Sequence, residues 1–340
     1  EEMHNLATVM PQLEGKSSEA IEKYQEEQRA LINTASAYGE SVKDVMESAR
    51  LWGRMYKDQA TVNTLVSQSA KLAVADNFSM AESTKAVEAA MFQYGLVAKN
   101  SAEALAYSNK IVDVYTKLSH NAGVSAQDLA AGVERSGSVA KQAGISFEYL
   151  NALIAQGTRA TALSGSEIGN MLKTMLASFN SDKAVKELNK LGIATTEVVN
   201  GVKKVRSAQA VLMDVAVAAQ GTNKDLKDLW IQMSGGKFQW AKAAAIFSNY
   251  QEIIKNWGLA VNSMGFTDNQ VKNQMDSLSR RINKLKADLT GMVAQGGNSG
   301  LTEWLKECVT ELDNFAKFLS SVSVSTYSAI GSMAKFAGIM

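Results

Sequence analysis

The chain has 340 residues, of which 46% are hydrophobic, and a formal net charge of +1. This apolar content is enough for a buried core and excludes a wholly disordered chain, and the nearly neutral charge excludes a general attraction to nucleic acid or to an anionic membrane. The single proline, Pro11, predicts a nearly all-α fold, because proline interrupts helices and is common in the loops of mixed folds.

The first segment of the chain, residues 1–35, is rich in charge. It opens with Glu-Glu-Met-His, without an initiator methionine, so we expect the chain to be cut from a longer polypeptide. Its apolar positions, among them Leu13, Tyr24 and Leu31, are sparse and surrounded by charged residues. We therefore expect a solvated or coiled-coil-like helix, or a linker, outside the core.

Residues 36–262 repeat one pattern: a glycine, an apolar residue, a small or hydroxyl residue, and then a new amphipathic run. Glycine adopts the left-handed conformation that ends a helix, and serine or threonine caps the next helix. The pattern starts at Gly95, Gly123, Gly144 and Gly192 within this range and again at Gly265 just beyond it. Pairs with capping-box spacing are Ser79 with Glu82, Ser125 with Asp128, Ser164 with Glu167 and Thr267 with Gln270. The expected helices of this core domain are 41–57, 60–75, 79–94, 101–121, 125–142, 146–159, 164–178, 181–191, 207–219 and 238–256.

One stretch near 195–206 departs from the helical pattern. Asn200-Gly201 stands between two runs rich in β-branched residues, and Asn-Gly is a strong signal for a two-residue hairpin turn. The sequence therefore predicts a small β-hairpin inserted in the helical domain. A hairpin of this size is marginal alone, so we expect it to be supported by packing on helices.

Beyond the core, residues 263–319 predict a long helical hairpin with a glycine-rich hinge at 296–300. Its first helix carries apolar residues at steps of four and three from Val271 to Met292, a heptad pattern that an oligomeric coiled coil also explains. Residues 320–340 are expected to form an apolar, serine-rich helix. The apolar stretch is long enough to span a bilayer, for which about 20 residues are needed, so packing on a partner helix and membrane activity both remain open.

The residues that could carry chemistry are few, and we expect no catalytic, cofactor-binding or metal site. The two histidines are His4 and His120, and His120 lies in a last helical turn, where the helix dipole explains it. Cys308 lies on an apolar stripe and is expected to be a small buried hydrophobe, since one cysteine can form neither an internal disulfide nor a cysteine cluster. The run Gly235-Gly236-Lys237 lacks the remaining residues of a phosphate-binding loop.

Two basic clusters stand out, Lys203-Lys204-Arg206 and Arg280-Arg281-Lys284-Lys286. Neither alternates with aromatic residues as a nucleic-acid platform does, and the second has acidic neighbours typical of a solvated helix face. The sequence therefore predicts a non-enzymatic interaction protein with no sequence-specific nucleic-acid binding.

The run from about Ser36 to Trp257 resembles the core region of phage tail tape measure proteins in the order and spacing of several phrases. These are Asn77–Glu82, Met91–Leu96, Asn121–Leu129, Ser138–Ser146, Thr161–Asn170, Ala184–Ile193 and Ser234–Trp240. The resemblance implies a protein of the virion tail, assembled in the host cytoplasm, that sets tail length and leaves ahead of the genome to aid its passage through the envelope. It implies as partners the tail tube protein, tail assembly chaperones, tail-tip or baseplate hub proteins, further copies of itself and the host membrane. It implies no catalytic residue.

A straight helical ruler gains about 1.5 Å per residue, whereas residues 41–264 are expected to turn every dozen or two residues. We therefore expect a folded module, with the ruler outside it. Two other functions remain open from the residues alone: a helical membrane-active effector resembling a pore-forming toxin, and a cytoplasmic helical scaffold.

Overall fold

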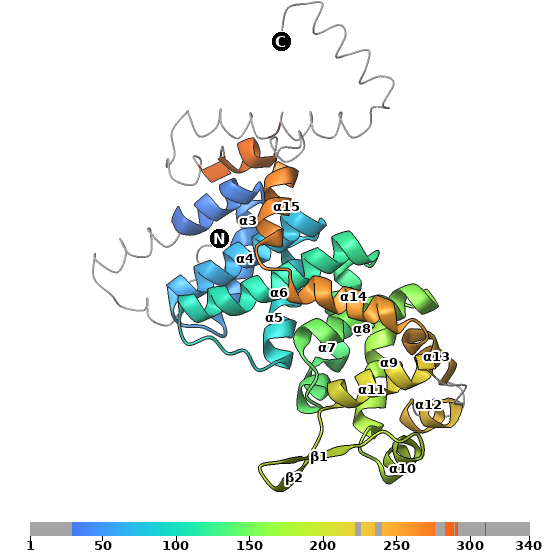
Figure 1. Cartoon of the computed structure of the whole chain (residues 1–340). Helices are drawn as coiled ribbons and strands as arrows, with labels where there is room; N and C mark the ends of the chain where they lie inside the picture. Colours follow the sequence, from blue (N-terminus) through green and yellow to red (C-terminus); the bar gives the residue numbers. More distant parts are fainter. Residues whose placement is uncertain are drawn as a thin grey trace, which may run out of the picture. The chain divides into compact units, whose positions relative to one another are not determined.

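The computed structural model describes residues 29–221, 226–234, 240–275, 283–288, 290, 291 and 310. The chain divides into two compact units, one comprising 1–47 with 273–340 and the other Ser48–Lys272. The described residues form helices and one two-stranded antiparallel hairpin (Figure 1), which confirms the predicted all-α class with a small β insertion.

The helices of the larger unit follow one another through short corners. The earlier ones are α3 (Val42–Gly53), which begins before this unit, α4 (Gln59–Asp76), α5 (Met80–Gln93), α6 (Ser101–Ala122), α7 (Ala126–Gln142), α8 (Phe147–Thr161), α9 (Gly165–Ser178) and α10 (Asp182–Lys190). After the hairpin come α11 (Ala208–Gly221), α12 (Lys227–Met233), α13 (Trp240–Phe247), α14 (Tyr250–Val261) and α15 (Phe266–Met275).

The corners have the predicted chemistry. All five glycines of the repeated pattern have positive φ, between 62° at Gly95 and 78° at Gly192. Ser79 and Ser164 cap α5 and α9 in complete capping boxes with Glu82 and Glu167. The expectation for Thr267 is wrong: it lies inside α15, and its N–H donates to a carboxylate from another helix, described below.

The expected helix over 238–256 is also wrong, because it is two helices, α13 and α14. Ser248 donates its hydroxyl to the carbonyl of Ala245, and Asn249 has φ −119° and ψ 70°, outside the helical region. Serine and asparagine compete for backbone hydrogen bonds in this way and so favour helix ends. The sequence analysis missed the short helix α12, whose Leu229, Trp230 and Met233 are buried.

Helices α7 and α9 approach each other through glycines. A Cβ on Gly169 would lie 2.5 Å from the carbonyl oxygen of Gly132 in α7, and one on Gly165 would lie 1.8 Å from the carbonyl oxygen of Asp128. Neither distance is possible for real atoms, so this helix pair requires glycine at both positions of α9. Around it, α8 contacts α7, α13 and α14, and α4 contacts α6.

The hairpin consists of β1 (Thr196–Val199) and β2 (Val202–Val205), with Val199 opposite Val202. Asn200 and Gly201 have φ of 53° and 78°, as a two-residue turn of the predicted kind requires. The expected support by helices is wrong, because every strand residue except Thr196 is exposed. The hairpin is held at its base, where the N–H of Arg206 donates to the carbonyl of Thr195.

In the smaller unit, the described residues include a helix over 29–38 and helical residues 283–288. Leu31 and Ile32 are buried, so the expectation of a solvated first segment is wrong at its described end. Most of the predicted heptad pattern, the hinge at 296–300 and the segment 320–340 lie outside the described residues. Within the part that is described, no helix combines the length and apolar character needed to cross a bilayer.

Candidate functional site

His120, the one histidine among the described residues, joins two helices. Its Nε2 atom lies 3.2 Å from the carbonyl oxygen of Ala75, at the end of α4, and 3.7 Å from a carboxylate oxygen of Asp76. The ring also packs edge-on against Phe266, at 6.0 Å between centroids. The His120 side chain therefore connects the end of its own helix, α6, to α4 and α15.

The same corner contains a hydroxyl, a carboxyl and an imidazole, the three groups of a Ser-His-Asp catalytic triad. Which of them are hydrogen-bonded to one another therefore decides whether they are arranged as a triad. Ser119 donates its hydroxyl to Asp76, not to His120. In a nucleophilic triad the serine donates to the histidine, which the carboxylate orients from its other side. Burial raises the pKa of Asp76, partly offset by the hydrogen bond from Ser119 and by the charge of His120. This geometry joins α4 to α6 and differs from that of a Ser-His-Asp triad.

The other residues considered for chemistry are mostly outside the described residues: His4, Cys308, Gly235-Gly236-Lys237 and Arg280-Arg281. Across the described ranges, no three histidine, cysteine, aspartate or glutamate side chains are grouped to hold a metal ion.

A hollow of about 380 Å³ lies in the smaller unit. It is bounded by the residues that lead into α3, from Gly39 to Asp44, and by Asn283, Lys286, Ala287 and Thr290. The hydroxyl of Ser41 accepts from the N–H of Asp44 and so caps this helix. Among the described side chains, the buried polar atoms that lack a partner belong to residues elsewhere, so nothing in this hollow points to a ligand.

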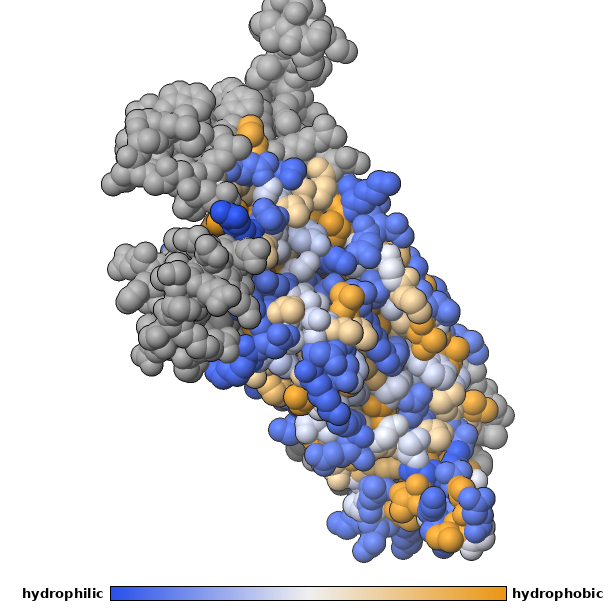
Figure 2. Space-filling view, turned by 90° about the vertical axis from the view of Figure 1, so that its left-hand side faces the viewer, coloured by the Kyte–Doolittle hydropathy of each residue, from blue (hydrophilic) through white to orange (hydrophobic). Residues whose placement is uncertain are grey.

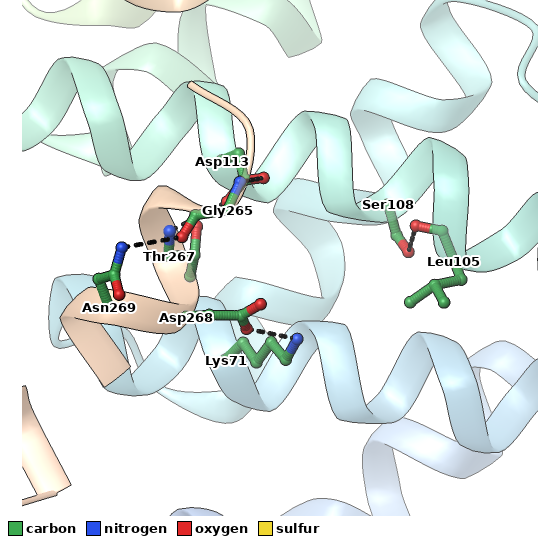
Figure 3. A network of polar contacts seen from close by, with 8 residues as sticks. All are labelled: Lys71, Leu105, Ser108, Asp113, Gly265, Thr267, Asp268 and Asn269. Atoms are coloured by element: carbon green, nitrogen blue, oxygen red, sulfur yellow. Dashed lines mark hydrogen bonds and ion pairs between the residues drawn. The ribbon is translucent and has the colours of Figure 1, made fainter. Parts of the chain in front are cut away.

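A polar network joins α6 to the start of α15 (Figure 3). Asp113, in the middle of α6 and only 4% exposed, accepts hydrogen bonds from two backbone N–H groups. Its Oδ2 lies 2.7 Å from the nitrogen of Gly265, and its Oδ1 lies 3.0 Å from the nitrogen of Thr267. The carboxylate thus acts as the cap of α15 from a residue 152 positions away.

Two further contacts hold the same helix start. Lys71 in α4 pairs with Asp268 at 2.6 Å, and the Lys117 ammonium lies 4.3 Å from the centre of the Phe266 ring. The sequence analysis missed this site, although one signal was present. Asp113 interrupts the apolar run Ile111-Val112-Asp113-Val114-Tyr115, and a carboxylate inside such a run needs a buried partner.

The structure separates the basic cluster of the hairpin into two parts. Arg206 is engaged at the base, where its guanidinium lies 2.7 Å from a carboxylate oxygen of Asp214 and 2.8 Å from the carbonyl oxygen of Ala194. Lys203 and Lys204 are on the exposed strand β2.

The same hairpin carries exposed apolar side chains. Val198, Val202 and Val205 are 73%, 58% and 65% exposed. Figure 1 shows the two strands extending from the helices of this unit, and in Figure 2 hydrophobic and hydrophilic side chains alternate at the end where the hairpin lies. The hairpin therefore exposes valine and lysine side chains side by side.

A family model described as phage-related minor tail protein matches residues 30–235, more than half of the chain. No solved structure matches it. The matched range includes the glycine-packed pair α7 and α9, the hairpin and α12. The chain belongs to the family of phage-related minor tail proteins.

Proposed function

We propose that this chain is the core module of a tail tape measure protein, the tail component that sets tail length while the tube polymerises and leaves ahead of the DNA to aid its passage through the host envelope. The family supports a structural role in a phage tail. The finer assignment is supported by the ordered phrases that resemble tape measure cores. Several of these phrases contain helix ends and caps of the structure, such as Ser79, Gly123 and Ser164.

The shortness of the helices supports the proposal that this module is folded and is not itself the ruler. The longest one within the described ranges, α6, has 22 residues and a length of about 33 Å. The chain turns after each helix, so residues Ser48–Lys272 fold as one compact unit. A compact unit adds little contour length per residue, and we therefore place the ruler outside these residues.

A tape measure protein acts by contact with other proteins. We propose that the partners are the tail tube protein, tail assembly chaperones, the tail-tip or baseplate hub and further copies of this chain along the tail axis. The module itself works by shape and surface contacts and performs no catalytic step. Late contact with the host membrane belongs to the same proposal.

The proposal is tested by electron microscopy of tails from phages whose tape measure gene carries in-frame deletions of defined size outside this module. We expect the tails to shorten by about 1.5 Å for each residue removed from a helical ruler. A matched silent recoding of the same region controls for effects on expression. Tails of unchanged length, or particles without tails at any deletion size, would contradict the length-setting function.

A further inference from the structure

Within the described ranges, β2 pairs with β1 on one side only, so its other backbone edge has no partner strand. Hydrogen-bonded and non-hydrogen-bonded pairs alternate along an antiparallel ladder. The pair Thr195 and Arg206 is hydrogen-bonded, with 3.0 Å between the nitrogen of Arg206 and the oxygen of Thr195. Counting from it with the observed register, Val205 and Lys203 belong to the non-hydrogen-bonded pairs. Their N–H and C=O groups therefore point away from β1, towards the outer edge.

The hairpin is also incomplete as a sheet. Two strands alone are marginally stable in water, and a third strand or a helix on one face is the usual support. Here the strands are exposed on both faces, since Val198 and Val205 lie on one face and Val199 and Val202 on the other. A strand added beside β2 would pair the free backbone groups and cover part of this valine surface.

The charges of the hairpin indicate which strand fits. Glu197 is the one carboxylate of the two strands and lies opposite Lys204, whereas Lys203 lies opposite Val198. The outer strand therefore has an excess of positive charge. A second copy pairing β2 with β2 would bring lysine beside lysine, and edge lysines commonly prevent such self-pairing. Acidic side chains opposite Lys203 and Lys204 would instead be attracted.

We propose that the outer edge of β2 is a docking site for an extended acidic segment of another protein, in which two adjacent carboxylate residues stand between β-branched residues, so that one carboxylate faces each lysine, and which adds as a third strand. Backbone hydrogen bonds to Lys203 and Val205 supply the pairing. The two lysine side chains select the acidic partner. This docking site stands on the hairpin alone and does not depend on whether the protein measures tail length.

The probe is a fluorescein-labelled peptide of about ten residues in which two adjacent glutamates are flanked on each side by valine and threonine, long enough to match a short strand. Its binding to the full 340-residue chain is measured by fluorescence anisotropy. Val205→Pro removes one outward N–H group and leaves the hydrogen-bonded pairs of the hairpin in place. We expect it to weaken binding about tenfold, the equivalent of one good interaction, whereas Val205→Ala, which keeps the N–H group, has a smaller effect.

Charge is tested separately, with a matched control. Lys203→Glu with Lys204→Glu should weaken binding of the acidic peptide by about tenfold or more and create binding of a peptide with lysine in place of glutamate. The control reverses two exposed lysines of α10, Lys183→Glu with Lys186→Glu, which gives the same net charge and should leave binding within about twofold.

Four results would overturn the docking site. The first is that the acidic peptide does not bind the unmodified chain at protein concentrations up to about 1 mM, at which even a site with a Kd of about 1 mM would be half occupied. The second is equal binding of the acidic and basic peptides, and the third is an equal effect of the hairpin and α10 charge reversals. Tighter binding of an oligothymidine strand than of the peptide would also overturn it, and would assign the lysines to nucleic acid instead. If Val205→Pro unfolds the hairpin, seen as loss of amide protection at Val199 and Val202, the charge variants decide the outcome.

Discussion

The glycine contact between α7 and α9 makes a sharp prediction for Gly169→Ala. The added Cβ would lie 2.5 Å from the Gly132 carbonyl oxygen and 2.9 Å from both the Gly132 Cα and the Arg135 Cβ. Two of these three atoms are backbone atoms, which cannot rotate away, so the helices must move apart. Overpacking of this kind costs about 1–3 kcal/mol, and replacing glycine by alanine inside a helix returns about 0.5–1 kcal/mol. We expect a net destabilisation of about 1–2 kcal/mol.

Gly258→Ala is the matched control. Gly258 also lies inside a helix, α14, but a Cβ there would meet no other atom within 4 Å. The same chemical change should therefore stabilise the protein by about 0.5–1 kcal/mol, from the helix preference of alanine alone.

The assay is urea unfolding followed by circular dichroism at 222 nm, with thermal melting as a second measure. For a domain of this size about 1 kcal/mol corresponds to about 2–4 °C in Tm, so the two variants should move Tm in opposite directions. Equal shifts for Gly169→Ala and Gly258→Ala, of either sign, would refute the close approach of α7 and α9.

Three further predictions concern carboxylates. Asp113→Ala leaves the N–H groups of Gly265 and Thr267 without their acceptor and should lower the free energy of unfolding, measured in urea, by about 2–4 kcal/mol. Asp113→Asn keeps one acceptor oxygen and should lower it less. Equal losses of stability in the two variants would contradict the cap by both carboxylate oxygens. Burial raises the pKa of Asp76 above the ordinary value of 3.8, so the contribution of its protonated form to stability is full below that value and is lost as pH rises through the raised pKa. In thermal melts across pH, Asp76→Asn should not show this loss of stability. A pH profile identical to that of the unmodified chain would contradict the raised pKa. Hydrogen bonds from the hydroxyl and backbone of the capping serines lower the pKa of Glu82 and Glu167 below 4.5, so the contributions of these carboxylates to stability are present above pH 4.5 and are lost as pH falls. In the double glutamine variant, Tm should therefore fall less steeply on the acid side. A fall in Tm as steep as that of the unmodified chain would contradict the capping boxes.

The helix boundaries of the larger unit could be predicted because their determinants are local. A capping serine such as Ser125 bonds to a residue three positions on, and a glycine such as Gly123 reverses the chain within one residue. The Asn200-Gly201 turn is local in the same way. Short-range spacing in the sequence therefore carries both the helical order and the hairpin.

The contacts that organise the helices could not be predicted, because their partners are far apart in the chain. Nothing near Asp113 shows that it caps a helix beginning at Phe266, and nothing near Gly169 shows that Gly132 lies against it. The exposure of the hairpin was missed for a related reason. Its valines indicate strands correctly, but burial depends on which elements return to cover them.

Our proposal is that residues Ser48–Lys272 form a folded module of a tape measure protein and do not measure length themselves. It is tested most directly by inserting a helical segment of about 30 residues, about 45 Å if it were part of a straight ruler, between Asn180 and Ser181. Both residues are exposed at the corner between α9 and α10. The account predicts tails of unchanged length by electron microscopy, and tails about 45 Å longer when the same segment is inserted in the proposed ruler outside the module. Lengthening from the insertion at Asn180, or no lengthening from either insertion, would contradict the account.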